Sequence, residues 1–426
     1  MTIQEKDQAY IWHPYTQMHT AKPAVPIVKA KDAILFTEDG KEIIDAVSSW
    51  WVNPLGHARK EIADAITAQM HELEHVIFAG FTHKPAVDLA ETLLNLLPSN
   101  QKRVFYTDNG STAIESAMKM AIQYYYNQGQ SKSKLIALDG AYHGDTFGAM
   151  SAGAKDTFFS AYDKFSFDVE HLPFPNGTND KAVLFQLENA LKQQDIAAFI
   201  FEPLLQGSAG MRMYSPEILD KCIALCKQYK VLTIADEVMT GFGRTGKLFA
   251  CDYLTEQPDM MCFSKCLTAG FMPLAVTTCS AEIYEAFLSE DKMKTFFHGH
   301  SYTGNAMGCA AALASLKLLT NETTKNQIAQ IASSHTAQLA KWKEHKAVRT
   351  IRQLGTVLAL EFETGENTSY FSSLRDELYD FFLERGVLLR PLGNVVYILP
   401  PYVITDEELK KVYRVIEEAL DRFGKN

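Results

Sequence analysis

Two residues of complementary chemistry each follow a strongly apolar run near the middle of the chain. Asp236 comes directly after Val231–Ala235, and Lys265 comes just after Met260–Phe263. In proteins that alternate strands and helices, the C-terminal ends of the strands open onto the crevice that binds ligands. Desolvation there lowers the pKa of a lysine and favours the neutral amine that attacks carbonyl carbon. The pair predicts an imine-forming lysine with a carboxylate nearby, although either residue alone could simply mark a strand end.

A turn rich in small and hydroxyl-bearing residues lies earlier in the chain. The segment Thr107–Thr112, with Gly110 and Ser111, follows an apolar run and leads into a helical pattern. Backbone N–H groups at a helix N-terminus bind phosphate, helped by the helix dipole, although an ordinary helix cap has the same appearance. Tyr142 follows a further apolar run and places an aromatic ring at another strand end.

These features together meet the requirements of pyridoxal 5′-phosphate. The cofactor needs a lysine for a Schiff base, a carboxylate that keeps its pyridine nitrogen protonated, a phosphate site and an aromatic ring against its face. We therefore predict that Lys265 is the Schiff-base lysine and the proton carrier, that Asp236 holds the ring nitrogen, and that Tyr142 stacks on the ring. Gly110 and Ser111 are the predicted phosphate contacts.

The predicted strands and helices that position these residues are typical of an α/β domain. Short apolar runs alternate with helical stretches such as Ser111–Tyr126 and Pro216–Tyr229. Continuous apolar strands between helices indicate a mainly parallel sheet that is buried on both faces. The predicted strands are Arg103–Tyr106, Leu135–Leu138, Ala197–Phe201, Val231–Ala235, Met260–Phe263 and Leu274–Cys279.

The helix that begins near Ser111 has the clearest pattern. Thr112 and Glu115 have the spacing of a capping box at its start. Apolar residues then recur on one helical face, at Ala113, Ala117, Met120, Ala121 and Tyr124.

The two ends of the chain differ from the middle in composition and in the pattern of predicted helices and strands. Residues 319–426 contain charged helices, short strands such as Val357–Phe362 and Val395–Leu399, and a last helix from about Asp406. Residues 1–55 contain a hairpin pattern, in which Ile34–Phe36 and Ile43–Ile44 flank a Gly-containing turn. We expect these two parts to form a smaller α+β domain beside a large domain at 56–318.

Longer motifs resemble the class III aminotransferases over nearly the whole chain. They are Ala235–Val238, Gly241–Lys247, Ser264-Lys265 and His298–Asn305. The resemblance implies a fold-type I pyridoxal phosphate enzyme that works as a homodimer with shared active sites. It implies that the last motif reaches the neighbouring subunit, where the Ser301 hydroxyl touches the phosphate, although most relatives have threonine there. It extends the cofactor site to Val238 and His300.

A narrower resemblance is to the branch of that family that converts 8-amino-7-oxononanoate to 7,8-diaminononanoate in biotin biosynthesis. It lies in Trp12–Met18, Ser48–Trp51, Tyr142–Gly148 and Arg390–Asn394. The resemblance implies S-adenosylmethionine as amino donor, with lysine as the alternative. The residues assigned to the substrate site are Tyr15, Trp50, Trp51, Tyr142, Asp145, Gly299 and Arg390.

The chemistry of the substrate agrees with these residues. Aromatic walls suit a chain of methylenes, and an arginine suits the terminal carboxylate through a bidentate pair. The adjacent tryptophans lie in a segment predicted to be a loop, where large aromatics more often face a ligand than a core. Core packing for the tryptophans and a structural ion pair for Arg390 remain the alternatives.

Composition narrows the class of protein. The chain has 426 residues, 47% of them hydrophobic, and a formal net charge of −10, which disfavours binding to nucleic acid or an anionic membrane. The first residues lack an apolar signal core, and no apolar stretch reaches the length of a membrane span. The seven cysteines lie mostly in apolar runs, which favours reduced, buried thiols. A cytoplasmic location is expected.

Three rival interpretations remain. His71-Glu72-Leu73-Glu74-His75 matches the zinc-peptidase pattern HExxH, but no neighbouring segment supplies the third ligand that a catalytic zinc needs, so no metal is predicted. A non-catalytic scaffold on the same fold is the second, and the intact set Asp236, Lys265, Gly110-Ser111 and Tyr142 argues against it. The third is a class III aminotransferase acting on another ω-amine.

Overall fold

The computed structural model describes residues 1–154, 160–365, 372 and 374–424. Its largest sheet has seven strands in the order β4-β12-β11-β10-β7-β5-β6. Neighbouring strands from β11 to β6 pair in parallel, and only β12 runs against its neighbours β11 and β4. The sheet is therefore mainly parallel, as predicted. Its strands are β4 (Gln101–Thr107), β5 (Lys134–Leu138), β6 (Val169–Leu172), β7 (Ile196–Phe201), β10 (Leu232–Asp236), β11 (Met260–Phe263) and β12 (Ala275–Ser280).

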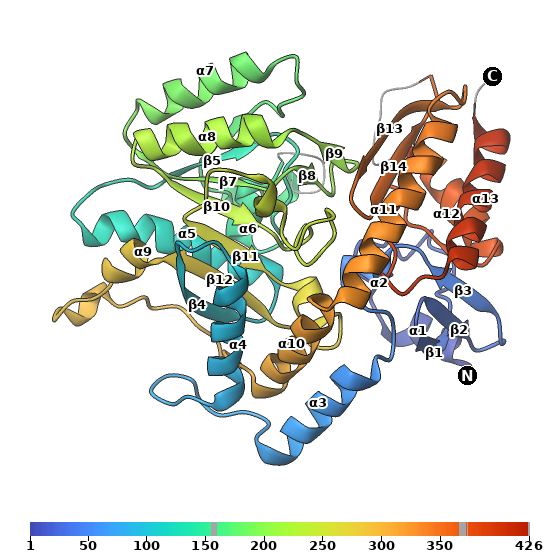
Figure 1. Cartoon of the computed structure of the whole chain (residues 1–426), viewed down its shortest axis with the longest axis horizontal. Helices are drawn as coiled ribbons and strands as arrows, with labels where there is room; N and C mark the ends of the chain where they lie inside the picture. Colours follow the sequence, from blue (N-terminus) through green and yellow to red (C-terminus); the bar gives the residue numbers. More distant parts are fainter. Residues whose placement is uncertain (155–159, 366–371, 373, 425–426) are drawn as a thin grey trace.

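The central strands form because they are apolar on both faces. Every residue of β7, β10 and β11 is buried. In β5, Leu135 and Ala137 pack into one core cluster and Ile136 and Leu138 into another, because successive side chains point to opposite faces. The six predicted strands are confirmed to within two residues at either end. Helices cover the sheet (Figure 1), namely α4 (Lys84–Leu96), α5 (Gly110–Asn127), α6 (Phe147–Ala152), α7 (Asp180–Leu191), α8 (Pro216–Gln228), α9 (Ala281–Glu285) and α10 (Ala306–Leu319).

Helix α5 confirms the predicted apolar face but not the predicted cap. All five residues of that face are buried. The capping box is formed by Asn109 and Thr112, so the prediction that Thr112 pairs with Glu115 was wrong. The Glu115 carboxylate instead accepts hydrogen bonds from the Thr146 hydroxyl and the Gly148 backbone N–H. Asn109 lies nearer the free N–H groups of the first turn, which leaves Glu115 for a tertiary contact.

The ends of the chain meet in a four-stranded sheet of order β1-β2-β3-β15. The predicted hairpin is present as β2 (Ile34–Thr37) and β3 (Glu42–Asp45), and β3 pairs in parallel with β15 (Val387–Leu388). Figure 1 shows these N-terminal strands beside α12 and α13, the last helices of the chain. The division at residues 55 and 319 stays a prediction. The other elements of this region are α1 (Ile3–Tyr10), β1 (Ile27–Lys31), α11 (Glu322–Trp342), β13 (Val348–Leu354), β14 (Val357–Phe362), α12 (Leu374–Glu384), β16 (Val395–Ile398) and α13 (Asp406–Phe423).

Two α-helices and a two-stranded antiparallel sheet make up the remaining α-helices and strands of the described residues: α2 (Ser48–Trp51), α3 (Lys60–Glu72), and β8 (Leu205–Gln206) with β9 (Arg212–Met213). All seven cysteines are buried and free. Within the described part of the chain, none of the helices combines the length and apolar character needed to cross a bilayer.

Candidate active site

A cavity of about 790 Å³ lies where the strands of the large sheet end. Parallel strands end at the same edge, so β5, β7, β10 and β11 bring their C-terminal residues together. Most of the residues predicted from the sequence line this cavity: Tyr15, Trp50, Trp51, Gly110, Ser111, Tyr142, Asp145, Asp236, Val238, Lys265 and Arg390.

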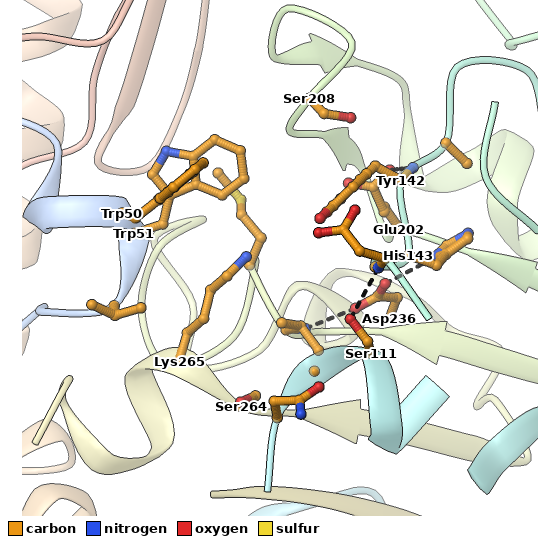
Figure 2. Close-up of a pocket in the computed structure, with 18 of the residues that line it drawn as sticks. Trp50, Trp51, Ser111, Tyr142, His143, Glu202, Ser208, Asp236, Ser264 and Lys265 are labelled. Carbon is orange, nitrogen blue, oxygen red and sulfur yellow. Dashed lines mark hydrogen bonds and ion pairs between the residues drawn. The ribbon is translucent and has the colours of Figure 1, made fainter. Parts of the chain in front are cut away.

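Lys265 begins a short 3₁₀ turn that is separated from β11 by Ser264, and its backbone φ of 43° is left-handed. Such strained non-glycine residues are concentrated at functional sites. Burial lowers the pKa of its amine, and the Asp236 carboxylate opposes that shift. The amine lies 4.7 Å from the ring centre of Trp51, and Figure 2 shows it pointing into the space between the tryptophans and Asp236. The site therefore favours a neutral, nucleophilic amine.

Asp236 is the last residue of β10 and is only 5% exposed. Its Oδ1 accepts a hydrogen bond of 3.0 Å from the Val238 backbone N–H, and its Oδ2 lies 2.7 Å from Nδ1 of His143. Since a carboxylate can only accept here, Nδ1 of His143 carries the proton. These two hydrogen-bond donors fix the orientation of the carboxylate, as a partner for a protonated ring nitrogen requires.

The N-terminus of α5 forms another wall. The backbone is packed so closely that a Cβ on Gly110 would lie 2.7 Å from Cγ1 of Val238. Gly144, with a φ of +126°, lets the chain approach Ser111, since a Cβ there would lie 2.1 Å from the Ser111 Oγ. The Asp145 backbone N–H donates to that Oγ at 3.2 Å. A hydroxyl and the first N–H groups of an 18-residue helix can together hold a phosphate.

Two tyrosines and an aspartate that line the cavity are connected through their side chains. The Tyr15 hydroxyl donates to Oδ2 of Asp145 at 2.6 Å and lies 3.2 Å from the Tyr142 hydroxyl. Burial, followed by the hydrogen bond that the Tyr142 hydroxyl donates to Tyr15, raises the pKa of Tyr142. Tyr142 therefore stays a neutral ring beside the cavity.

The paired tryptophans occupy different environments. Trp51 is only 5% exposed, belongs to the core, and donates from Nε1 to the Tyr397 hydroxyl at 2.9 Å. Trp50 is 38% exposed, and the Arg390 guanidinium carbon lies 4.3 Å from its ring centre. The segment is a short, irregular helical turn rather than the predicted loop. Trp51 therefore packs in the core as well as lining the cavity, whereas the ring of Trp50 is partly exposed beside the cavity.

Arg390 makes no ion pair of the kind that the alternative interpretation required. Among the described residues, its guanidinium has no salt bridge or hydrogen bond. It is held by stacking on Trp50 and lines the cavity. An unpaired cation in a cavity can bind an anionic group of a ligand.

Sequence reasoning missed three residues of the site. His143 stood in the quoted Tyr142–Gly148 motif without a role, and Tyr397 contacts Trp51 from a distant strand. Glu202 follows β7 directly, accepts hydrogen bonds from the Tyr142 and Gly207 backbone N–H groups, and has its pKa raised to about 7 by burial. The strand-end rule that selected Asp236 would also have found Glu202.

The predicted residues Gly299, His300 and Ser301 do not line this cavity. The Ser301 carbonyl oxygen instead lies 2.6 Å from Nε2 of His75. The HExxH pattern does not form one helical face, because α3 ends at Glu72 and His75 lies beyond it. In the described ranges, no group of three or more His, Cys, Asp or Glu side chains is arranged to hold a metal.

The arrangement fits pyridoxal 5′-phosphate. Lys265 offers an amine with a lowered pKa, Asp236 a hydrogen-bonded carboxylate, and Ser111 the start of a helix for the phosphate. Tyr142, Asp236, Ser111 and Lys265 surround the same cavity (Figure 2). Each requirement of the cofactor is met by a different strand end or helix end.

Comparison with known proteins agrees with this chemistry. The family model described as aminotransferase class-III matches residues 15–420. The chain is 45% identical over 420 residues to the adenosylmethionine-8-amino-7-oxononanoate aminotransferase of Synechococcus elongatus, covering 97% of this chain and 98% of the relative. It is 38% identical over 436 residues to the enzyme of the same name from Helicobacter pylori, covering 98% of each chain.

Solved structures give the same result. The crystal structure of the adenosylmethionine-8-amino-7-oxononanoate aminotransferase from Methanocaldococcus jannaschii has a TM-score of 0.93 and 36% identity, covering 99% of both chains. The omega transaminase from Pseudomonas jessenii in complex with PMP has a TM-score of 0.92 and 26% identity, covering 99% of this chain and 98% of that one. The chain belongs to the class III aminotransferases, and pyridoxal 5′-phosphate is its cofactor.

Proposed function

We propose that this aminotransferase transfers the amino group of S-adenosylmethionine to 8-amino-7-oxononanoate, giving 7,8-diaminononanoate in biotin biosynthesis. The printed names of the relatives support both substrates, since each names adenosylmethionine as well as 8-amino-7-oxononanoate. They favour S-adenosylmethionine over lysine as donor, and the proposed acceptor over another ω-amine partner.

One observation carries the proposal, namely the unpaired Arg390 beside Trp50. The acceptor is a long apolar chain that ends in a carboxylate. Trp50 and Tyr15 meet edge to face at 5.5 Å and form an aromatic wall for the methylenes. Arg390 at the end of that wall can receive the carboxylate through a bidentate pair.

Each residue around the cofactor would have a separate role in the reaction. Bound pyridoxal 5′-phosphate supplies a carbonyl carbon that takes up the amino group and a ring that accepts electrons. Asp236, fixed by His143, would hold the proton on the ring nitrogen. Lys265 would bind the cofactor and then move a proton at the amine-bearing carbon of the substrate, because its amine points into the same space. Ser111 and the N-terminus of α5 would hold the phosphate.

Two half-reactions test the proposal separately. Purified holoenzyme is mixed with S-adenosylmethionine or with lysine, and conversion to the pyridoxamine form is followed by absorbance. The pyridoxamine form is then mixed with 8-amino-7-oxononanoate, and its return to the pyridoxal form is followed. In parallel, ornithine and 4-aminobutyrate are tested as donors with the pyridoxal form. Conversion by lysine but not S-adenosylmethionine would overturn the donor and leave the acceptor untouched. Absence of turnover with 8-amino-7-oxononanoate would overturn the function.

We also propose a homodimer whose active sites are shared. A surface formed by residues 75–83 and 297–304 exposes large apolar side chains, including Ile77, Phe81, Phe297 and Tyr302. These segments touch each other through the His75–Tyr302 ring contact. An exposed apolar surface of this kind is typical of a protein interface, and residues 299–301 stand on it, away from their own cavity.

A subunit-mixing experiment tests the shared site. Lys265→Ala destroys one subunit's own site, and Ser301→Arg should block the phosphate site of its partner. Each variant alone is expected to be inactive, whereas mixed subunits regain activity because a heterodimer contains one intact site. Failure of the mixture to regain activity, with heterodimers demonstrated by mass, would contradict the shared site.

The compartment that we propose is the cytoplasm. The seven free, buried cysteines suit a reducing environment. Cell fractionation with an antibody against the chain tests this directly.

A further inference from the structure

The turn that carries the paired tryptophans has an unusual backbone. Ser48, Ser49 and Trp51 have φ values of 51°, 60° and 66°, in the left-handed region that favours glycine. Trp50 lies among them with φ −128° and ψ 58°. Non-glycine residues persist in this region only when the surrounding structure holds them there. A group outside the turn must therefore fix its conformation.

Asp45 is that group. It is the last residue of β3, and its side chain is fully buried. Its Oδ2 accepts hydrogen bonds from the Ser49 backbone N–H at 2.7 Å and from the Ser49 hydroxyl at 3.1 Å. Its Oδ1 accepts from the Val47 and Ser49 backbone N–H groups at 3.2 and 2.9 Å. A buried carboxylate thus satisfies the N–H groups that enter the turn.

His57 completes the arrangement from the far side of the turn. Its Nε2 lies 2.9 Å from Oδ2 of Asp45, and its Nδ1 lies 3.0 Å from Nδ2 of Asn53. With Asn53 donating to Nδ1, the proton of the neutral ring is on Nε2 and is donated to Asp45. The same carboxylate is therefore tied to the chain both before and after the tryptophans.

The arrangement also lies at the base of the Arg390 segment. In the parallel pairing of β3 with β15, Asp45 stands opposite Leu388, and the Ala46 backbone N–H donates to the Leu388 carbonyl oxygen at 3.2 Å. The two strands end at the same edge and then lead to Trp50 and Arg390. Movement of the turn would therefore separate the indole from the guanidinium that lies 4.3 Å from it.

We propose that Asp45 and His57 are a positioning pair for the substrate pocket. They hold the 48–51 turn in its left-handed conformation, so that Trp50 faces Arg390 and Trp51 faces Lys265. Neither residue lines the cavity, so the pair acts through the tryptophans. The kinetic consequence rests on the proposed acceptor, whereas the conformational consequence does not.

The kinetic test uses three variants and a matched control. Asp45→Asn turns one acceptor into a donor, and His57→Leu removes the donor to Asp45, whereas His57→Gln keeps an N–H donor of similar reach. The control is His335→Leu, which removes a buried, hydrogen-bonded histidine in α11 that does not line the cavity. Asp45→Asn and His57→Leu should raise KM for 8-amino-7-oxononanoate at least tenfold with a smaller change in kcat. His57→Gln should recover most of that loss, and His335→Leu should leave KM unchanged.

A spectroscopic test follows the turn without any substrate. The chain has four tryptophans, so holoenzyme labelled with 5-fluorotryptophan gives four assignable ¹⁹F signals. Asp45→Asn and His57→Leu should shift or split the signals of Trp50 and Trp51. His335→Leu should instead shift that of Trp342, because the Tyr413 ring packs against both His335 and Trp342.

The outcomes separate the two proposals. Unchanged Trp50 and Trp51 signals in folded His57→Leu, or KM values that follow those of His335→Leu, would overturn the positioning pair. If the wild-type enzyme does not turn over 8-amino-7-oxononanoate, the proposed function fails, and the ¹⁹F comparison still decides the pair. If Asp45→Asn does not fold, the comparison of His57→Leu with His57→Gln decides it.

Discussion

Replacement of Arg390 by leucine is the sharpest test of the substrate site. The guanidinium stacks on Trp50 and has no ion pair or hydrogen bond among the described residues. Its removal therefore leaves no carboxylate of the protein unpaired. Folding should be nearly unaffected, within the roughly 0.5 kcal/mol expected of a substitution outside a core or network. Almost the whole effect should fall on the ligand.

The size of that effect follows from the ion pair that the acceptor would no longer make. A bidentate, charge-assisted pair with the acceptor's carboxylate is worth about 2–3 kcal/mol net. At 1.4 kcal/mol per factor of ten, this predicts a rise of about 30–150-fold in KM for 8-amino-7-oxononanoate. Arg390→Lys keeps the charge without the planar fork and should cost about tenfold or less.

The assay compares the acceptor with its methyl ester in the wild-type enzyme and both variants. The ester lacks the carboxylate, so Arg390→Leu should change its KM only through the missing guanidinium–indole stacking, about threefold or less. The ratio of the two effects isolates the interaction with the carboxylate, as in a double-mutant cycle. Equal losses for acid and ester, or a large fall in thermal stability, would refute a substrate role and return Arg390 to a structural one.

Three further results are expected. Lys265→Ala should abolish turnover and the bond that borohydride reduces, and labelling of another lysine in the wild-type enzyme would contradict the assignment. Asp236→Asn should lower kcat about 100-fold or more with little change in KM, because its charge matters most as electrons flow into the ring; near-wild-type turnover would count against this role. Burial lowers the pKa of His335 from 6.5 to about 4, so its contribution to stability is present above pH 6.5 and lost as pH falls toward 4. The difference in free energy of unfolding between wild type and His335→Leu should shrink by about 2 kcal/mol from pH 7 to pH 5, as measured by urea titration; a constant difference would show that His335 does not titrate in this range.

The sequence by itself determined the large sheet and the centre of the site. Each strand is a separate apolar run in the sequence. The residue at its C-terminal end lies at the ligand-binding edge of the sheet, and this does not depend on the order of the strands. Asp236 and Lys265 could therefore be placed from their neighbours alone, and both line the cavity. The same rule, applied consistently, would have added Glu202.

Only the tertiary structure decided the contacts between distant segments. Trp50 contacts Arg390 because β3 pairs in parallel with β15. His143, which follows β5, contacts Asp236 at the end of β10 because only β7 lies between these two strands in the sheet. Glu115 likewise accepts a hydrogen bond from the first turn of α6, and not from its own helix cap, because the fold brings α6 beside α5. Local patterns specify which face of an element is buried, but they do not specify its partner. The partner is set by strand order and register, which depend on how the whole chain packs.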